Sequence, residues 1–237
     1  MKVLKTILAL FISFTVTAQA VQDITYFDIP TDQVGEFIQT HKKFMDVTMN
    51  EERKVQGQWV YRHFYGSGAS VAVFTDFANI NDAVNDDPWA SLRSKWQSSN
   101  EDERKELEAL GQKYASFLVN HSDDIRSSNF ENNFVGKENV DWDIPFVLVV
   151  GNYNVNKPNA SIAGNAFMEW RTKPGVEKGL QLGGGYTTHF SGSGPDLQLF
   201  SGFKNIVDFA KSVSTEDVSN SEASSAFWAE ITGDHED

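Results

Sequence analysis

Two stretches of the sequence decide the fold, because one nearly repeats the other. Residues 63–83 read HFYGSGASVAVFTDFANINDA, and residues 189–209 read HFSGSGPDLQLFSGFKNIVDF. At a constant offset of 126 residues, ten of the first twenty positions are identical and no gap is needed. Upstream, Phe44-Met45-Asp46 matches Phe167-Met168-Glu169 at an offset of 123, so the second copy carries three extra residues in a loop. Self-similarity of this kind indicates an internal duplication, and we expect two copies of a unit of about 110 residues.

Both copies show the same order of hydrophobic patterns, which predicts the same order of elements. In the first copy the predicted strands are 24–29, 58–65, 71–77 and an extended segment near 126–134, and the predicted helices begin at Thr31 or Asp32, at Asn79 and at Asn100. In the second copy the predicted elements are a strand at 146–150, a helix near Ser161, a hairpin around Gly192-Ser193-Gly194, and helices at 204–213 and 226–231. This order is that of the ferredoxin-like, or split βαβ, unit of the α+β class.

Two such units in one chain resemble the dimeric α+β barrel superfamily, in which two sheets meet face to face. The repeated hairpin, the FMDV sequence at 44–47 and the HSDD sequence at 121–124 carry the resemblance. It is to antibiotic-biosynthesis-monooxygenase-like and NIPSNAP-like proteins, and most to exported bacterial members of unassigned function. The resemblance implies a tandem duplication that forms a barrel within one chain. Only six residues follow Ile231, so we expect the second unit to lack its last strand, which leaves that half of the barrel open or its edge filled by another segment.

The first twenty residues are predicted to be a signal peptide. Lys2 and Lys5 precede an apolar run that ends near Val16, and Ala18-Gln19-Ala20 is a small-x-small cleavage pattern. The run is shorter than a membrane-spanning helix requires. We therefore expect an exported bacterial protein of the periplasm or the medium that begins at Val21 and has no membrane attachment after cleavage. Its first repeat would span 21–135, its linker 136–144 and its second repeat 145–237.

Composition excludes several classes of function. The chain has 237 residues, no cysteine and a formal net charge of −13. The lack of cysteine excludes a disulfide scaffold, a thiol nucleophile and cysteine-based metal sites. An acidic surface repels phosphate backbones, so no nucleic-acid partner is expected. The sequence contains neither a phosphate-binding glycine motif before a helix nor a G-x-S-x-G elbow, and no histidine spacing suits a metal, so no metal and no cofactor are expected.

An aromatic strand face carries the main candidate site. By the two-residue period of a strand, Trp59, Tyr61, His63 and Tyr65 share one face. Such a face could line a pocket for an apolar or aromatic ligand, with one imidazole as its polar group. A packed sheet with a hydrogen-bonded histidine would show the same pattern, so both interpretations stay open.

The second copy repeats only part of that face. His189 corresponds to His63, but Gly185 replaces Trp59 and Thr187 replaces Tyr61. A second site, if it exists, would be roomier and less aromatic than the first.

Three further histidines complete the candidates. His41 lies on the apolar stripe of the first helix, where it is either a ligand-binding residue or a buried, hydrogen-bonded core residue. His121 and His235 each follow a predicted helix, and a helix C-terminus favours the protonated imidazole.

Three classes of function remain. The first is an exported protein that binds a small apolar or aromatic ligand between sheet and helices. The second is an enzyme like the cofactor-free oxygenases or isomerases among the proteins it resembles, with His63 as acid or base beside Tyr61 and Trp59. The third is a protein-interaction module, or an oligomer, that uses exposed sheet edges. A polar cavity beside His63 would favour the first two, and a packed interior there would favour the third.

Overall fold

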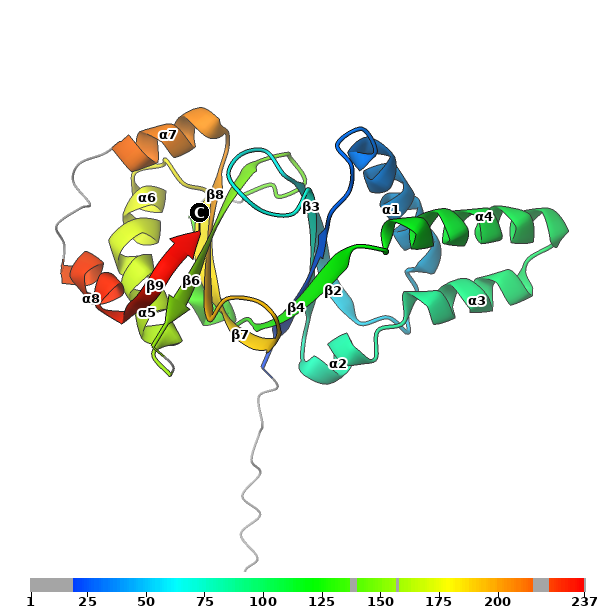
Figure 1. Ribbon diagram of the computed structural model, residues 1–237, viewed down its shortest axis with the longest axis horizontal. Helices are drawn as coiled ribbons and strands as arrows, with labels where there is room; N and C mark the ends of the chain where they lie inside the picture. The colour runs from blue at the N-terminus through cyan, green and yellow to red at the C-terminus, as the bar shows by residue number, and fades with distance from the viewer. Residues whose placement is uncertain (1–18, 137–139, 157, 215–221, 237) are drawn as a thin grey trace, which may run out of the picture.

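The fold is a nine-stranded antiparallel sheet that divides into two halves with helices on their outer faces. The computed structural model describes residues 19–136, 140–156, 158–214 and 222–236, so most of the expected signal peptide lies outside the described residues. The strand order is β2-β3-β1-β4-β7-β8-β6-β9, with β5 paired to β7. Figure 1 shows the two halves facing each other, with α1, α3 and α4 outside one and α5 to α8 outside the other. A hydrogen bond of 3.0 Å from Gln198 Nε2 to the Tyr26 hydroxyl joins the halves across the interior.

The elements follow the order expected for two ferredoxin-like units. The first unit comprises β1 Val21–Phe27, α1 Val34–Thr48, β2 Val55–Arg62, β3 Val71–Phe77, α2 Ile80–Val84, α3 Pro88–Ser98, α4 Glu101–Phe117 and β4 His121–Ser127. A 3₁₀ turn at Phe130–Asn132 and β5 at Asn133–Val135 follow it. The second unit comprises β6 Val147–Val155, α5 Ala160–Phe167, a π-helical turn at Met168–Thr172, α6 Lys173–Glu177, β7 Gly183–Gly192, β8 Leu197–Phe203, α7 Ile206–Ser214, α8 Glu222–Glu230 and β9 Ile231–Glu236.

The strand registers repeat with the same offset as the sequence. In the first unit Val21 pairs with Phe77, and in the second Val147 pairs with Phe203. Trp59 opposite Phe74 likewise corresponds to Gly185 opposite Phe200. All four positions differ by 126 residues between the units, so the predicted duplication is confirmed in three dimensions. We call residues 126 apart counterparts.

The expectation that the second unit lacks its last strand is wrong. β9 pairs with β6 as β4 pairs with β1, so that Tyr153 lies opposite His235 and Phe27 opposite His121. Helix α8 ends at Glu230, and the six residues of β9 that follow are about the average length of a strand. The side chain of His235 itself lies outside the described part of the chain.

The two units differ at their edges. β7 pairs with β8 on one side and with β4 and β5 on the other, which closes the barrel there. Its counterpart β2 pairs only with β3 among the described strands, and β2 and β9 are the two ends of the strand order. The barrel is therefore closed along one seam and open along the other.

Several predicted boundaries shift for local reasons. Helix α1 begins after Gln33 rather than Thr31 or Asp32, because a turn closes from Gln33 N–H to the Pro30 carbonyl. β2 ends at Arg62 rather than Tyr65, and beyond it Gly66 and Gly68 take positive φ in the turn. The cap of α4 is confirmed: Asn100 accepts from the backbone of Asp102 and Glu103 in a capping box.

Two separate cores lie between the sheet halves and their helices. The first is built on Phe27, Phe37, Phe44 and Tyr114, and it packs α1, α3 and α4 against the outer face of β1 and β3. The second is built on Tyr153, Tyr186 and Phe227, and it packs α5 and α8 against β6, β7 and β8. Burial of this apolar surface is the main source of stability for each unit.

Candidate functional site

A cavity of about 300 Å³ lies between the outer face of the second half-sheet and its helices. Its floor is formed by β6 and β8, and its walls by the π-helical turn, α6, α7 and α8. Six aromatic side chains line it: Tyr153, Phe167, Trp170, Phe203, Phe209 and Trp228. A concave space walled mainly by aromatic groups with few polar ones is typical of sites for small apolar ligands.

The period of the strands explains how the sequence builds this floor. In β6, Val149, Gly151 and Tyr153 alternate with residues that face the barrel interior. Gly151 has no side chain and Ser201 has a small one, so the floor leaves space beneath the helices. The counterparts of Tyr153, Leu199 and Phe203 in the first unit are Phe27, Val73 and Phe77, and both sets are buried.

The cavity contains basic groups and no acidic group. Arg171 and Lys178 are the charged residues among those that line it. The Arg171 guanidinium lies over the Trp170 ring, 5.3 Å from its centroid, and its side chain is half-buried. Burial lowers the pKa of Arg171 from its ordinary value, and the nearby Tyr153 acts in the opposite direction.

The predicted aromatic face of the first unit is only partly assembled. Trp59 and Tyr61 point between the two half-sheets, where the Tyr61 ring meets Phe74 at 5.1 Å and Phe146 at 5.9 Å. Burial raises the pKa of Tyr61 far above its usual range. His63 and Tyr65 follow the end of the strand and are exposed, so the structure does not bring them together with Trp59 and Tyr61.

His189 lies in a charged cluster at the closed seam. Its Nδ1 is 3.2 Å from Oδ1 of Asp124, and Oδ2 of Asp124 accepts a hydrogen bond of 2.6 Å from Arg126. Neither His189 Nδ1 nor Asp124 Oδ1 makes a well-directed hydrogen bond, although both atoms are buried. Asp124 and Arg126 come from the first unit and His189 from the second, so this cluster joins the units.

Arg126 is a buried charged residue at the seam that sequence reasoning missed. Its side chain is fully buried, and it also donates to the Thr187 hydroxyl at 2.7 Å and to the Pro195 carbonyl at 3.0 Å. The extended segment was expected only near 126–134, so Asp124 lay outside it, although Asp124 and Arg126 lie two apart and share a face in β4. The turn at Gly192-Ser193-Gly194 packs closely against this cluster. A Cβ on Gly194 would collide with the Asp124 carboxylate.

His41 is held by protein groups on both ring nitrogens. Nδ1 lies 3.1 Å from the Tyr114 hydroxyl and Nε2 lies 3.0 Å from Gln58 Oε1. Burial lowers the pKa of His41, so the neutral imidazole is favoured. This geometry agrees with the interpretation of His41 as a buried, hydrogen-bonded core residue on the apolar face of α1.

His121 ends up at a helix terminus, as its position suggested. Its Nδ1 lies 2.6 Å from the Leu118 carbonyl, just beyond α4.

Among the described residues no three histidine or carboxylate side chains gather as a metal site would require.

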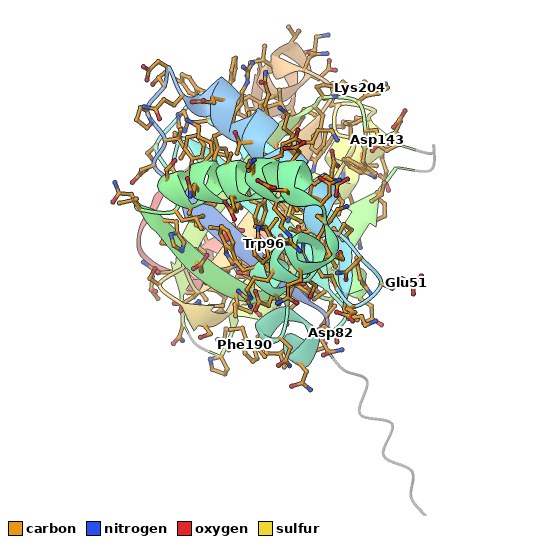
Figure 2. All side chains as sticks on the ribbon, turned by 90° about the vertical axis from the view of Figure 1, so that its right-hand side faces the viewer. Glu51, Asp82, Trp96, Asp143, Phe190 and Lys204 are labelled. Carbon is orange, nitrogen blue, oxygen red and sulfur yellow. The ribbon has the colours of Figure 1, made fainter. Side chains whose placement is uncertain are left out.

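A second hollow lies on the surface of the first unit, between α3 and α4. It has a volume of about 400 Å³ and is a more open groove, lined by Leu92, Trp96 and Leu107 among others. Figure 2 looks onto this side of the molecule, with Trp96 beneath α4. The Trp96 indole donates to Glu108 at 2.9 Å, so the groove's main aromatic group already has a polar partner.

Comparisons with known proteins support the fold. No protein-family model and no curated protein sequence matches the chain. Among solved structures, a candidate monooxygenase from Lactobacillus acidophilus aligns over 92% of both chains with a TM-score of 0.57 at 11% identity. An anthrone oxidase-like protein aligns over 92% of this chain and 88% of its own, with a TM-score of 0.56 at 11% identity. A candidate monooxygenase from Fusobacterium nucleatum aligns over 92% of this chain and 91% of its own, again with a TM-score of 0.56 and 11% identity.

These likenesses confirm the expected α+β architecture, because each alignment spans both units. At this level of identity they concern the fold alone. In the segments that the structure describes, no helix has the length and apolar character needed to cross a membrane.

Proposed function

We propose that the protein binds a small apolar or aromatic molecule in the cavity of the second unit. The observation that carries the proposal is the group of six aromatic side chains around about 300 Å³ of space. Ligand sites of this kind are concave, mostly apolar and largely pre-formed. The cavity lies over β6 and β8 of the second unit, whereas the hollow between α3 and α4 of the first unit is a more open groove.

A neutral fluorescent probe tests the proposal. N-phenyl-1-naphthylamine brightens when it leaves water, and we expect a saturable rise in its emission with the wild-type protein. Val149→Trp would fill the cavity from its floor and should abolish the rise. Gln112→Trp fills the groove between α3 and α4 and should leave binding unchanged. Equal binding by both variants would overturn the proposal, and far-UV circular dichroism would check that each variant is folded.

A cofactor-free oxygenase acting on an aromatic substrate is the second candidate. The descriptions of the similar structures, an anthrone oxidase-like protein and two candidate monooxygenases, favour it. Oxygen uptake with anthrone as the probe substrate tests it. If Val149→Trp stops uptake, the reaction takes place in the second-unit cavity. If His63→Ala stops it instead, the exposed histidine predicted from sequence is the acid or base.

An interaction role would use the open seam. β2 and β9 are the edges of the sheet, and unpaired strand edges can accept another strand. This role predicts concentration-dependent association, which analytical ultracentrifugation measures directly.

Export to the bacterial periplasm or the medium remains part of the proposal. The basic start, the apolar run and Ala18-Gln19-Ala20 support it, as does the resemblance to exported members of the superfamily. Intact mass spectrometry of protein from a bacterial periplasmic extract should give a chain that begins at Val21. A chain that still carries residues 1–20 would count against export.

A further inference from the structure

We infer that the ligand of the second-unit cavity is an aromatic carboxylate, and that Arg171 binds its anionic group. This inference rests on the proposed function, since it concerns the same cavity. It adds a chemical class to the ligand and a specificity-determining residue to the site.

The charge of the cavity is opposite to that of the protein. The whole chain has 33 acidic and 20 basic residues. The cavity lining contains Arg171 and Lys178 and no aspartate or glutamate. A hollow that carries one sign of charge within low-dielectric walls concentrates ions of the other sign. The electrostatic potential inside the cavity therefore favours an anion, although the acidic surface of the protein as a whole repels anions.

Arg171 has no carboxylate partner among the described residues. Glu169, which lies two residues earlier in the same π-helical turn, forms an ion pair with Lys173 instead. The guanidinium stacks on Trp170, which holds it in place but leaves its N–H groups without an anionic acceptor. A half-buried cation without a counter-ion has lost part of its hydration and has gained no ion pair in exchange.

A carboxylate suits this guanidinium in geometry and in energy. Arginine presents a planar fork of N–H donors that binds both oxygens of a carboxylate. The aromatic walls, with Trp170 and Trp228 among them, would contact the ring of the same molecule. An aromatic acid therefore satisfies both the apolar walls and the unpaired cation, whereas a neutral aromatic molecule satisfies only the walls.

Two probes with the same ring system test this inference. Isothermal titration calorimetry would measure binding of 2-naphthoate and of 2-naphthalenemethanol, which differ in the anionic group. The wild-type protein should prefer the acid by about tenfold or more, as expected for a charge-assisted hydrogen bond. Arg171→Gln should reduce that preference to about one while the affinity for the alcohol stays within about twofold.

The matched control is Arg104→Gln. Arg104 lies over the Trp96 ring at 4.7 Å in the first unit, so this variant removes the same charge from a similar stacked position away from the cavity. It should keep the full preference for the acid. Equal affinities of the wild type for the two probes, or a preference that survives Arg171→Gln, would overturn the inference while leaving the proposed function intact. If neither probe binds the wild type, the proposed function itself fails.

Discussion

The two repeat-related histidines, His63 and His189, have diverged in their surroundings. His63 is exposed in the turn after β2, whereas His189 is mostly buried beside Asp124. Replacing His189 with Ala removes the mostly buried imidazole beside Oδ1 of Asp124 at the closed seam and should cost about 1–3 kcal/mol of unfolding free energy. Replacing His63 with Ala should change it by less than about 0.5 kcal/mol. Urea denaturation of the two variants measures both values, and equal losses would contradict this asymmetry.

Asp23 makes the free energy of unfolding fall as the pH rises, which is opposite to the usual effect of a carboxylate in a folded protein. Burial, with the negative charge of Asp123 added to it, raises the pKa of Asp23 from 3.8 to about 6. Between these two values the folded state holds a proton that the unfolded state has released. The folded state therefore loses relative stability as the pH rises through this window, and the cost is fully present above about pH 6.

Asp23→Asn should remove this cost. At pH 7.5 the variant is expected to be more stable than the wild type by about 2–3 kcal/mol, and the gain should shrink towards zero near pH 4. Asp46→Asn is the control, because Asp46 is exposed and forms only an i,i+4 pair with Lys42. It should shift stability by less than about 0.5 kcal/mol at either pH. A gain for Asp23→Asn that is independent of pH would show that ionisation is not its cause.

At the scale of elements, β4 is the strand that unites the two units. Arg126 and Asp124 form an ion pair that is buried at the seam with β7, where Arg126 also binds Thr187. Arg126→Met would remove the guanidinium that pairs with the buried Asp124 carboxylate, and it should cost about 3–5 kcal/mol of unfolding free energy. Arg93→Met breaks the exposed Arg93–Asp87 pair and should cost no more than about 1 kcal/mol. Similar losses of stability in the two variants would mean that burial does not determine how much the Arg126–Asp124 ion pair contributes to stability.

The elements also show which local patterns can be predicted from sequence. The capping box of α4 and the hairpin around Gly66-Ser67-Gly68 depend on neighbouring residues, and both are found where they were expected. The start of α1 depends on a turn that competes with the better-known capping residues Thr31 and Asp32. Residues Gly183-Gly184-Gly185, which precede the second hairpin, lie inside β7 and pair with β5, and a Cβ on Gly185 would collide with Asn132 and Asn133. That constraint comes from a distant segment and leaves no local signal.

At the scale of the whole molecule, the open and closed seams make an internal comparison possible. β2 and β7 are counterparts, but only β7 has strands on both sides. Backbone amides of β7 should therefore exchange with deuterium much more slowly than those of β2, half of which face the open seam. Hydrogen-exchange mass spectrometry of wild-type protein reports both strands in one experiment. Equal protection of β2 would show that another chain or segment covers that edge in solution.

The duplication and the α+β class could be read from the sequence because they rest on similarity and periodicity. The cavity could not, since its aromatic residues come from β6, β8 and several helices that meet only in the folded molecule. The predicted face around Trp59 and Tyr61 depended on a strand reaching Tyr65, and that strand ends at Arg62. Arg126 escaped notice because a single arginine in a polar strand resembles a surface residue until its burial is known.

The constant offset between the units also has a consequence for stoichiometry. A protein built from two equal halves would ordinarily take up two ligand molecules, and their binding could be cooperative. Here Phe27, Val73 and Phe77 and their counterparts Tyr153, Leu199 and Phe203 are all buried, and the cavity of about 300 Å³ lies beside the second set. A titration should therefore end at one molecule per chain with a simple hyperbolic curve, because the proposed site is the cavity of the second unit, for which the first unit serves as a scaffold.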